Sequence, residues 1–119
     1  MKKINLKSKF KKFNDLWSPK VIAEMNDYQF KLVIIKDEFI WHQHEDTDEV
    51  FFVIEGKMNI EFEERIVELN EGEMLVVPKG QKHKPFAKKE AKIMLVEPRG
   101  VVNTGNIESE ITAPSDHWI

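Results

Sequence analysis

The chain has 119 residues, of which 41% are hydrophobic and 33% are charged, and its net charge at neutral pH is −3. This length and composition predict one soluble globular domain, and the weakly acidic charge argues against a nucleic-acid-binding protein. The absence of cysteine excludes disulfide bonds, a thiolate metal site and a cysteine nucleophile. No apolar run approaches the roughly 20 residues of a membrane-spanning helix, and the N-terminus lacks the apolar stretch of a signal peptide, so we expect a cytoplasmic location.

The first 20 residues are basic and have helical periodicity. They contain seven lysines and one acidic residue, and apolar side chains recur at intervals of four, three and four, at Leu6, Phe10, Phe13 and Trp17. This pattern predicts an amphipathic helix at about 5–17, capped by Asn5 and ended by Ser18-Pro19. Such a helix can lie on an anionic membrane, but more often it packs against its own domain, which is what we expect here.

Beyond residue 20 the apolar pattern changes to a two-residue period, which is typical of strands. The predicted strands are 21–25, 28–37, 39–44, 49–55, 57–63, 65–69, 74–77, 83–87 and 91–97. The links between them are too short for the crossovers that parallel strands require. The sequence therefore predicts an all-β fold, an antiparallel sandwich or small barrel with one helix in front, followed by a tail whose signals are weak.

Three of the four histidines occur in a pattern that indicates a metal site. His42 and His44 are two residues apart in a predicted strand and so share a face, and Glu49 opens the next strand. Antiparallel pairing can bring His83, on a later strand, beside them. Three imidazoles and a carboxylate inside a barrel would lack polar partners, and one divalent cation would satisfy all four. The alternative is that these histidines are ordinary core or surface residues.

The spacing of these residues resembles the two motifs of the cupin superfamily. The first is His-x-His-x4-Glu-x6-Gly, from His42 to Gly56, and the second is Gly-x5-Pro-x-Gly-x2-His, from Gly72 to His83. The resemblance implies a double-stranded β-helix, or jelly-roll barrel, in one domain over 1–119: a short N-terminal helix at about 5–17, the barrel at about 20–97 and a tail at 98–119. It also implies that His42, His44, Glu49 and His83 are the metal ligands.

Two segments outside these motifs indicate which group of cupins the chain resembles. Residues 17–19 and 102–105 are similar to those of small single-domain (type 2) cupins that are often labelled mannose-6-phosphate isomerase-like. A sugar-phosphate site usually needs arginine side chains or a phosphate-binding loop. This chain has only two arginines, Arg65 in a predicted hairpin and Arg99 after the last strand, which argues against such a substrate.

Strand alternation also predicts the surroundings of the metal. If the ligands face inward, a set of apolar side chains does so too: Ile40, Phe51, Met58 and Ile60. We expect these residues to line a pocket for a small, largely apolar or chelating molecule, although they could instead simply fill the core.

These observations favour a metalloenzyme with dioxygenase, isomerase or lyase chemistry. The cofactor would be one divalent transition metal, namely iron, manganese, nickel, copper or zinc, and we expect no organic cofactor. No separate general base can be assigned, so the catalytic residues stay open. The alternatives are a ligand-binding or sensor barrel without catalysis and a metal that only braces the fold.

The expected partners are a small-molecule ligand and a second copy of the chain, without nucleic acid or membrane. A sandwich of this size has edge strands to cover, and the segment 31–35 is apolar on both faces, which suits a homodimer interface.

Overall fold

The computed structural model describes residues 1–105 and 107–119. Within these residues the chain forms one short helix, α1 (Leu6–Phe10), and seven strands: β1 (Lys20–Met25), β2 (Tyr28–Glu38), β3 (Glu49–Glu55), β4 (Met58–Glu61), β5 (Ile66–Leu69), β6 (Met74–Val77) and β7 (Lys84–Pro98). All pairings between these strands are antiparallel. The predicted all-β antiparallel architecture is confirmed.

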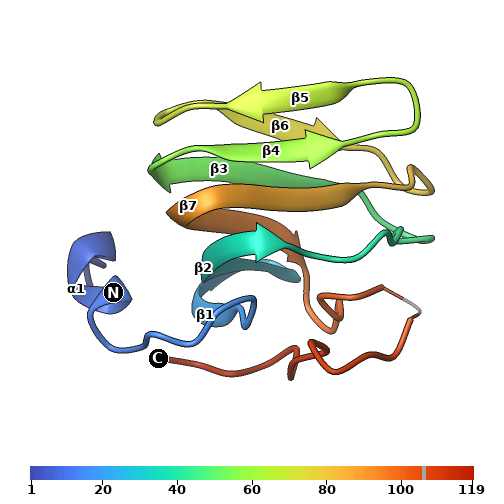
Figure 1. Cartoon of the computed structure of the whole chain (residues 1–119). Helices are drawn as coiled ribbons and strands as arrows, with labels where there is room; N and C mark the ends of the chain where they lie inside the picture. Colours follow the sequence, from blue (N-terminus) through green and yellow to red (C-terminus); the bar gives the residue numbers. More distant parts are fainter. Residues whose placement is uncertain (106) are drawn as a thin grey trace.

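The strand β7 connects the main sheet to the hairpin formed by β4 and β5. The main strand order is β1-β2-β7-β3-β6, and β4 pairs with both β5 and β7. The start of β7 pairs with β4, at Lys84–Phe86, whereas residues 92–96 pair with β3. In Figure 1 the β4–β5 hairpin therefore lies over β3 and β6 rather than beside them.

Apolar side chains from the main sheet and from the β4–β5 hairpin meet in the core between the sheet and the hairpin. In β3, buried residues alternate with partly exposed ones from Glu49 to Ile54, as expected for β-branched and aromatic residues on a half-buried strand. The resulting core comprises Val33, Ile35, Phe51, Val53, Met58, Ile60, Leu69, Val77, Ala87, Ala91, Ile93 and Leu95.

Two strand predictions were wrong in detail. Within the predicted strand 39–44 only His42 pairs, through a single bridge to His83, because this segment leaves the sheet as a loop. The predicted strands 83–87 and 91–97 form one continuous strand. The polar residues between them, 88–90, are exposed and continue β7 at the point where its pairing changes from β4 to β3.

The predicted helix at 5–17 is much shorter in the structure. Asn5 caps it as expected, since its side chain accepts a hydrogen bond from the Ser8 N–H at 2.9 Å, but α1 ends at Phe10. Further along, the Trp17 N–H donates to the Ile34 carbonyl oxygen at 2.9 Å, so pairing with β2 outweighs helix propensity there. No helix among the described residues is long and apolar enough to cross a membrane.

The outer face of β2 is covered by the N-terminal segment of the same chain. Leu32 and Ile34 are buried in a second apolar cluster with Ile22 and Phe10, against which Leu6 and Phe13 also pack. The segment 31–35 is therefore buried on both faces within one chain. This removes the argument that linked it to a dimer interface, and the homodimer stays a prediction.

The end of the tail extends the sheet beyond β1. The Val21 N–H donates to the His117 carbonyl oxygen at 2.7 Å, and the Ile119 N–H donates to the Val21 carbonyl oxygen at 3.1 Å. Lys9 Nζ also donates to the Ile119 carbonyl oxygen at 2.7 Å, and Figure 1 shows both chain ends on one side of the molecule. The tail thus folds back across the sheet and fixes the N-terminal segment.

Candidate metal centre

The four predicted ligands come together at one end of the core. His42 and His44 lie in the loop between β2 and β3, Glu49 is the first residue of β3, and His83 directly precedes β7. All four are buried, and each offers a ligand atom within 4.8 Å of the others. Sequence spacing therefore identified a real cluster in space, although the loop, rather than a strand, presents the first two histidines.

The loops that carry the ligands are tied together by backbone contacts. The Gly80 N–H donates to the His44 carbonyl oxygen at 2.8 Å, and the Lys79 N–H donates to Asp48 Oδ1 at 2.9 Å. Gly80 has a φ of 77°, in the left-handed region that glycine adopts at little cost. The turn of the second motif is thus held against the loop of the first.

Several ligand atoms have no hydrogen-bond partner. His44 Nε2 lies 3.4 Å from Glu49 Oε1, and His83 Nε2 lies 3.7 Å from the same oxygen, both longer than an ordinary hydrogen bond. Within the described residues these three buried atoms lack any partner. Unpaired buried polar atoms are costly, and a divalent cation between them would satisfy all three. The residues present therefore fit a metal ion.

Two of the imidazoles are oriented by backbone carbonyls. His42 Nδ1 lies 2.9 Å from the Ile40 carbonyl oxygen, and His83 Nδ1 lies 2.8 Å from the Gln81 carbonyl oxygen. Since a carbonyl oxygen only accepts, each Nδ1 carries a hydrogen, which leaves Nε2 as the ring nitrogen available to a metal. This is the arrangement that prepares histidine for a metal through Nε2.

The pKa values of His42 and Glu49 also suit metal binding. Burial, together with the neighbouring His83, lowers the pKa of His42 to about 4, so its ring is neutral at neutral pH. Burial alone would raise the pKa of Glu49, but the His44 and His83 rings outweigh it and hold the pKa below its ordinary value. The site thus offers a neutral imidazole at His42 and an ionised carboxylate at Glu49.

Beside the ligands lies a buried charged pair that the sequence analysis missed. Lys31 Nζ is 3.4 Å from Glu97 Oε2, and both side chains are 2% exposed. Burial raises the pKa of Glu97 well above its ordinary value, and the charge of Glu49 raises it further. The two-residue period of the sequence carried a signal for both residues. Lys31 shares a strand face with the buried Val33 and Ile35. Glu97 shares a strand face with the buried Ile93 and Leu95.

A small cavity adjoins the site. Its volume is about 30 Å³, which is room for about two water molecules. It is lined by Trp17, Pro19, Val33, Ile35, Phe39, His42, Glu49, Phe51, Met58, Pro85, Ile93, Leu95 and Asn103. The cavity wall is largely apolar, and two metal-ligand candidates border it.

The predicted pocket residues divide into two groups. Phe51 and Met58 line the cavity, whereas Ile40 and Ile60 are not among the lining residues. Ile60 is fully buried in the core, and Ile40 belongs to the loop and provides the carbonyl oxygen that His42 contacts.

Other lining residues come from the two ends of the chain, where strand alternation has no predictive value. Trp17 has a φ of 60° and stacks on Phe39, with ring centroids 4.7 Å apart. Asn103 donates to the Trp17 and Ile111 carbonyl oxygens at 2.9 and 2.8 Å, and so binds the tail to the N-terminal segment. The sequence analysis included Asn103 only in the segment 102–105 that is similar to small single-domain cupins.

Comparisons with known proteins agree with this geometry. The model of the family described as "Cupin domain" matches residues 32–97. A cupin-2 domain containing protein from Shewanella frigidimarina NCIMB 400, of known crystal structure, is 60% identical with a TM-score of 0.80, over 81% of this chain and 94% of that one. Protein NMB1881 from Neisseria meningitidis is 33% identical with a TM-score of 0.75, over 82% of this chain and 99% of that one.

A curated relative matches over a shorter range. The uncharacterized protein YdbB of Bacillus subtilis (strain 168) is 38% identical over 64 residues, which are 53% of this chain and 57% of YdbB. The chain thus aligns with little more than half the length of this relative. The family match covers more than half of this chain and includes both motifs, and the fold and the buried ligand cluster agree with it: the protein belongs to the cupin family.

Proposed function

We propose that the protein is a metal-dependent enzyme that acts on a small, largely apolar or chelating organic molecule. Its metal would be one divalent transition ion, held by His42, His44, Glu49 and His83. The observation that carries the proposal is the convergence of three unpaired buried atoms, His44 Nε2, His83 Nε2 and Glu49 Oε1. A ligand set of three imidazoles and one carboxylate suits iron, manganese, nickel, copper and zinc, and it leaves positions free on a five- or six-coordinate ion.

Backbone carbonyl oxygens would then orient the ligands, and apolar side chains would exclude water from the site. The Ile40 and Gln81 carbonyl oxygens hold the His42 and His83 rings in one tautomer. Phe51 and Met58 form part of an apolar wall beside the ligands. When bound, the metal would supply Lewis-acid or redox chemistry at an open coordination position, with dioxygenase, isomerase or lyase reactions as the candidate classes.

The cavity wall provides no separate acid or base. Among its lining residues the polar groups are His42, Glu49, Asn103 and the Trp17 indole. The Asn103 amide is already engaged with Trp17, Ile111 and Ala113, and the indole N–H donates to the Lys36 carbonyl oxygen at 2.9 Å. This favours reactions in which the metal activates the substrate directly.

The test is turnover by protein loaded with Fe(II) or Mn(II), assayed with chelating diketones, catechols and hydroxy acids and monitored by oxygen uptake and product analysis. We expect turnover that is lost in His44→Ala but retained in His117→Ala, since His117 is exposed and outside the cluster. Phe51→Arg should keep the metal and lose turnover. Metal-loaded protein that is inert towards all of these substrate classes would contradict the enzyme proposal.

A second candidate is a ligand-binding or sensor barrel without catalysis. The observation that favours it is the same lack of a separate acid or base among the residues that line the cavity. A small molecule that co-purifies at one per chain and is returned unchanged after incubation with the metal-loaded protein would support this candidate over the enzyme.

A further inference from the structure

The cavity beside the ligands is too small for the kind of molecule that the proposed function requires. Its volume is about 30 Å³, whereas pockets that hold organic ligands usually measure about 300–1,000 Å³. The cavity borders His42 and Glu49, so it leads directly to the candidate ligands. An organic molecule that approaches the metal through this cavity therefore requires a part of the cavity wall to move.

Trp17 is the outermost ring of an aromatic stack that leads from the surface to the ligands. Its indole stacks on Phe39 with ring centroids 4.7 Å apart, and Phe39 meets the His42 ring edge-on with centroids 5.2 Å apart. Phe39 is 6% exposed, whereas Trp17 is only partly buried. Trp17 thus lines the cavity and also reaches the surface of the molecule.

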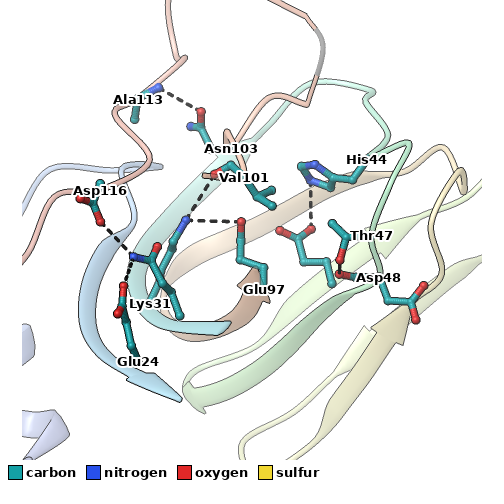
Figure 2. Close-up of polar contacts among 12 residues, drawn as sticks. Glu24, Lys31, His44, Thr47, Asp48, Glu97, Val101, Asn103, Ala113 and Asp116 are labelled. Atoms are coloured by element: carbon teal, nitrogen blue, oxygen red, sulfur yellow. Dashed lines mark hydrogen bonds and ion pairs between the residues drawn. The ribbon is translucent and has the colours of Figure 1, made fainter. Parts of the chain in front are cut away.

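The backbone of Trp17 is held more firmly than its side chain. Its N–H donates to the Ile34 carbonyl oxygen, and its carbonyl oxygen accepts from the Asn103 amide, both at 2.9 Å. The Asn103 side chain in turn accepts from the Ala113 N–H at 2.9 Å, as Figure 2 shows. Among the described residues the indole nitrogen makes one hydrogen bond, to the Lys36 carbonyl oxygen. The indole can therefore turn about a fixed backbone by breaking that bond and its aromatic stack.

The backbone conformation of Trp17 is unusual for a bulky residue. Its φ is 60°, in the left-handed region that residues other than glycine seldom adopt. Such residues persist only where surrounding contacts hold them, and they concentrate at ligand clamps and switch regions. The position of this residue in the cavity wall agrees with a role in access to the site.

We propose that Trp17 is a specificity-determining residue whose indole closes the cavity and limits, by size, which molecules reach the metal. Ligands no larger than about two water molecules fit the closed cavity, and larger chelating molecules enter only when the indole turns outward. An open form populated at about 0.1–10% would slow the larger molecules about 10- to 1,000-fold. The inference rests on the proposed function and adds the route by which the organic molecule enters.

Phe62 offers a matched control for Trp17. It is also partly buried, packs against the same core cluster, and its ring centroid lies 6.4 Å from that of His83. In the part of the chain that the structure describes, Phe62 does not line the cavity but borders a separate surface pocket with Arg65 and Gln81. Truncation of Phe62 therefore removes an aromatic ring near the ligands without opening the cavity wall.

The experiment measures how fast azide and 4-nitrocatechol associate with the Co(II)-loaded protein, by stopped-flow absorption. Trp17→Ala should speed the association of nitrocatechol about tenfold or more. Azide should stay within about twofold of its rate with the wild type, because it already fits the cavity. Trp17→Phe keeps a ring on Phe39 but cannot donate to Lys36, so its nitrocatechol rate should fall between the two. Phe62→Ala should give the wild-type rate with both probes.

Every other result decides against the proposal or against the proposed function. Unchanged nitrocatechol rates in folded Trp17→Phe and Trp17→Ala protein would overturn the role of Trp17, and so would acceleration by Phe62→Ala instead. Equal acceleration of azide and nitrocatechol would indicate a loosened site without selection by size. The expected rates in a protein that turns over no substrate would support this inference and contradict the enzyme. A wild-type protein that does not bind Co(II) would overturn the proposed function, and this inference with it.

Discussion

His42 and His83 are joined through their backbones in both directions: the N–H of each donates to the carbonyl oxygen of the other at 2.9 Å. Their ring centroids lie 4.3 Å apart. Two candidate ligands from distant parts of the sequence are thus brought together by the main chain itself. These backbone contacts predict a site that assembles without the ion.

Removal of the metal should therefore leave the fold intact. A chelator-treated protein should keep its circular dichroism spectrum and unfold cooperatively. Metal at 100 times its dissociation constant should raise the free energy of unfolding by about 2.7 kcal/mol, because only the folded state holds the complete site. The measurement is urea unfolding with and without chelator. Loss of folded structure on chelation would instead indicate a metal that braces the fold.

The stability of the metal-free protein should fall as the pH is lowered from 6.5 to about 4. The pKa of His42 is about 4 in the folded chain, against an ordinary value of 6.5, so between these values the unfolded state binds the proton and the folded state does not. Protonation therefore favours unfolding as the pH falls through this window, by up to about 3 kcal/mol.

Comparison of variants by urea unfolding at several pH values isolates this contribution. The dependence on pH should be shallower in His42→Asn than in the wild type. His117→Asn changes an exposed imidazole and should keep the wild-type dependence. Equal slopes in His42→Asn and the wild type would show that His42 titrates normally.

The candidate site could be predicted from the sequence because its residues lie within two short motifs. Two short motifs fix the spacing of His42, His44, Glu49 and His83, and strand alternation directs Phe51 and Met58 inward. The N-terminal helix was predicted too long because its periodicity continues to Trp17, which instead turns inward and stacks on Phe39. Pairing of this segment with β2 is a long-range contact, and local propensity does not contain it.

The contacts of the residues that support the site are also long-range, so local propensity does not predict them. Asn103 joins the tail to the N-terminal segment, a contact between residues 86 positions apart. Lys31 and Glu97 meet only because β2 pairs with β7. Their inward positions could be read from the alternation, but which buried charges meet depends on strand order, and that order is a property of the whole fold.

Gly105→Ala should displace the tail from the ligand loop. Gly105 has a φ of 64°, and a Cβ at this position would overlap the carbonyl oxygen of Gln43, the residue between His42 and His44. We expect a loss of at least about 1–3 kcal/mol in the free energy of unfolding from the backbone strain alone, and more from the overlap.

Gly100→Ala provides the matched control, because Gly100 has a φ of 90° but nothing within 4 Å of an added Cβ. Urea unfolding of both variants should show the larger loss for Gly105→Ala. Equal losses would show that the approach of the tail to Gln43 contributes nothing.

Ile119→Ser should weaken the attachment of the tail. Ile119 packs against the apolar cluster that contains Phe10 and Leu32, and its backbone is bonded to Val21. Removing a partly buried apolar side chain should lower the free energy of unfolding by about 1–2 kcal/mol, as measured by urea unfolding. Met25→Ser, at a side chain that is 57% exposed, should change it little. Equal stability of the two variants would contradict docking of the tail.

The central claim is that His42, His44, Glu49 and His83 hold a metal ion, and the most direct test is elemental mass spectrometry of untagged protein. The predicted result is close to one iron, manganese, nickel, copper or zinc ion per chain, lost in His44→Ala and retained in His117→Ala. Protein that is folded, contains no metal and takes up none of these ions when they are added would contradict the account.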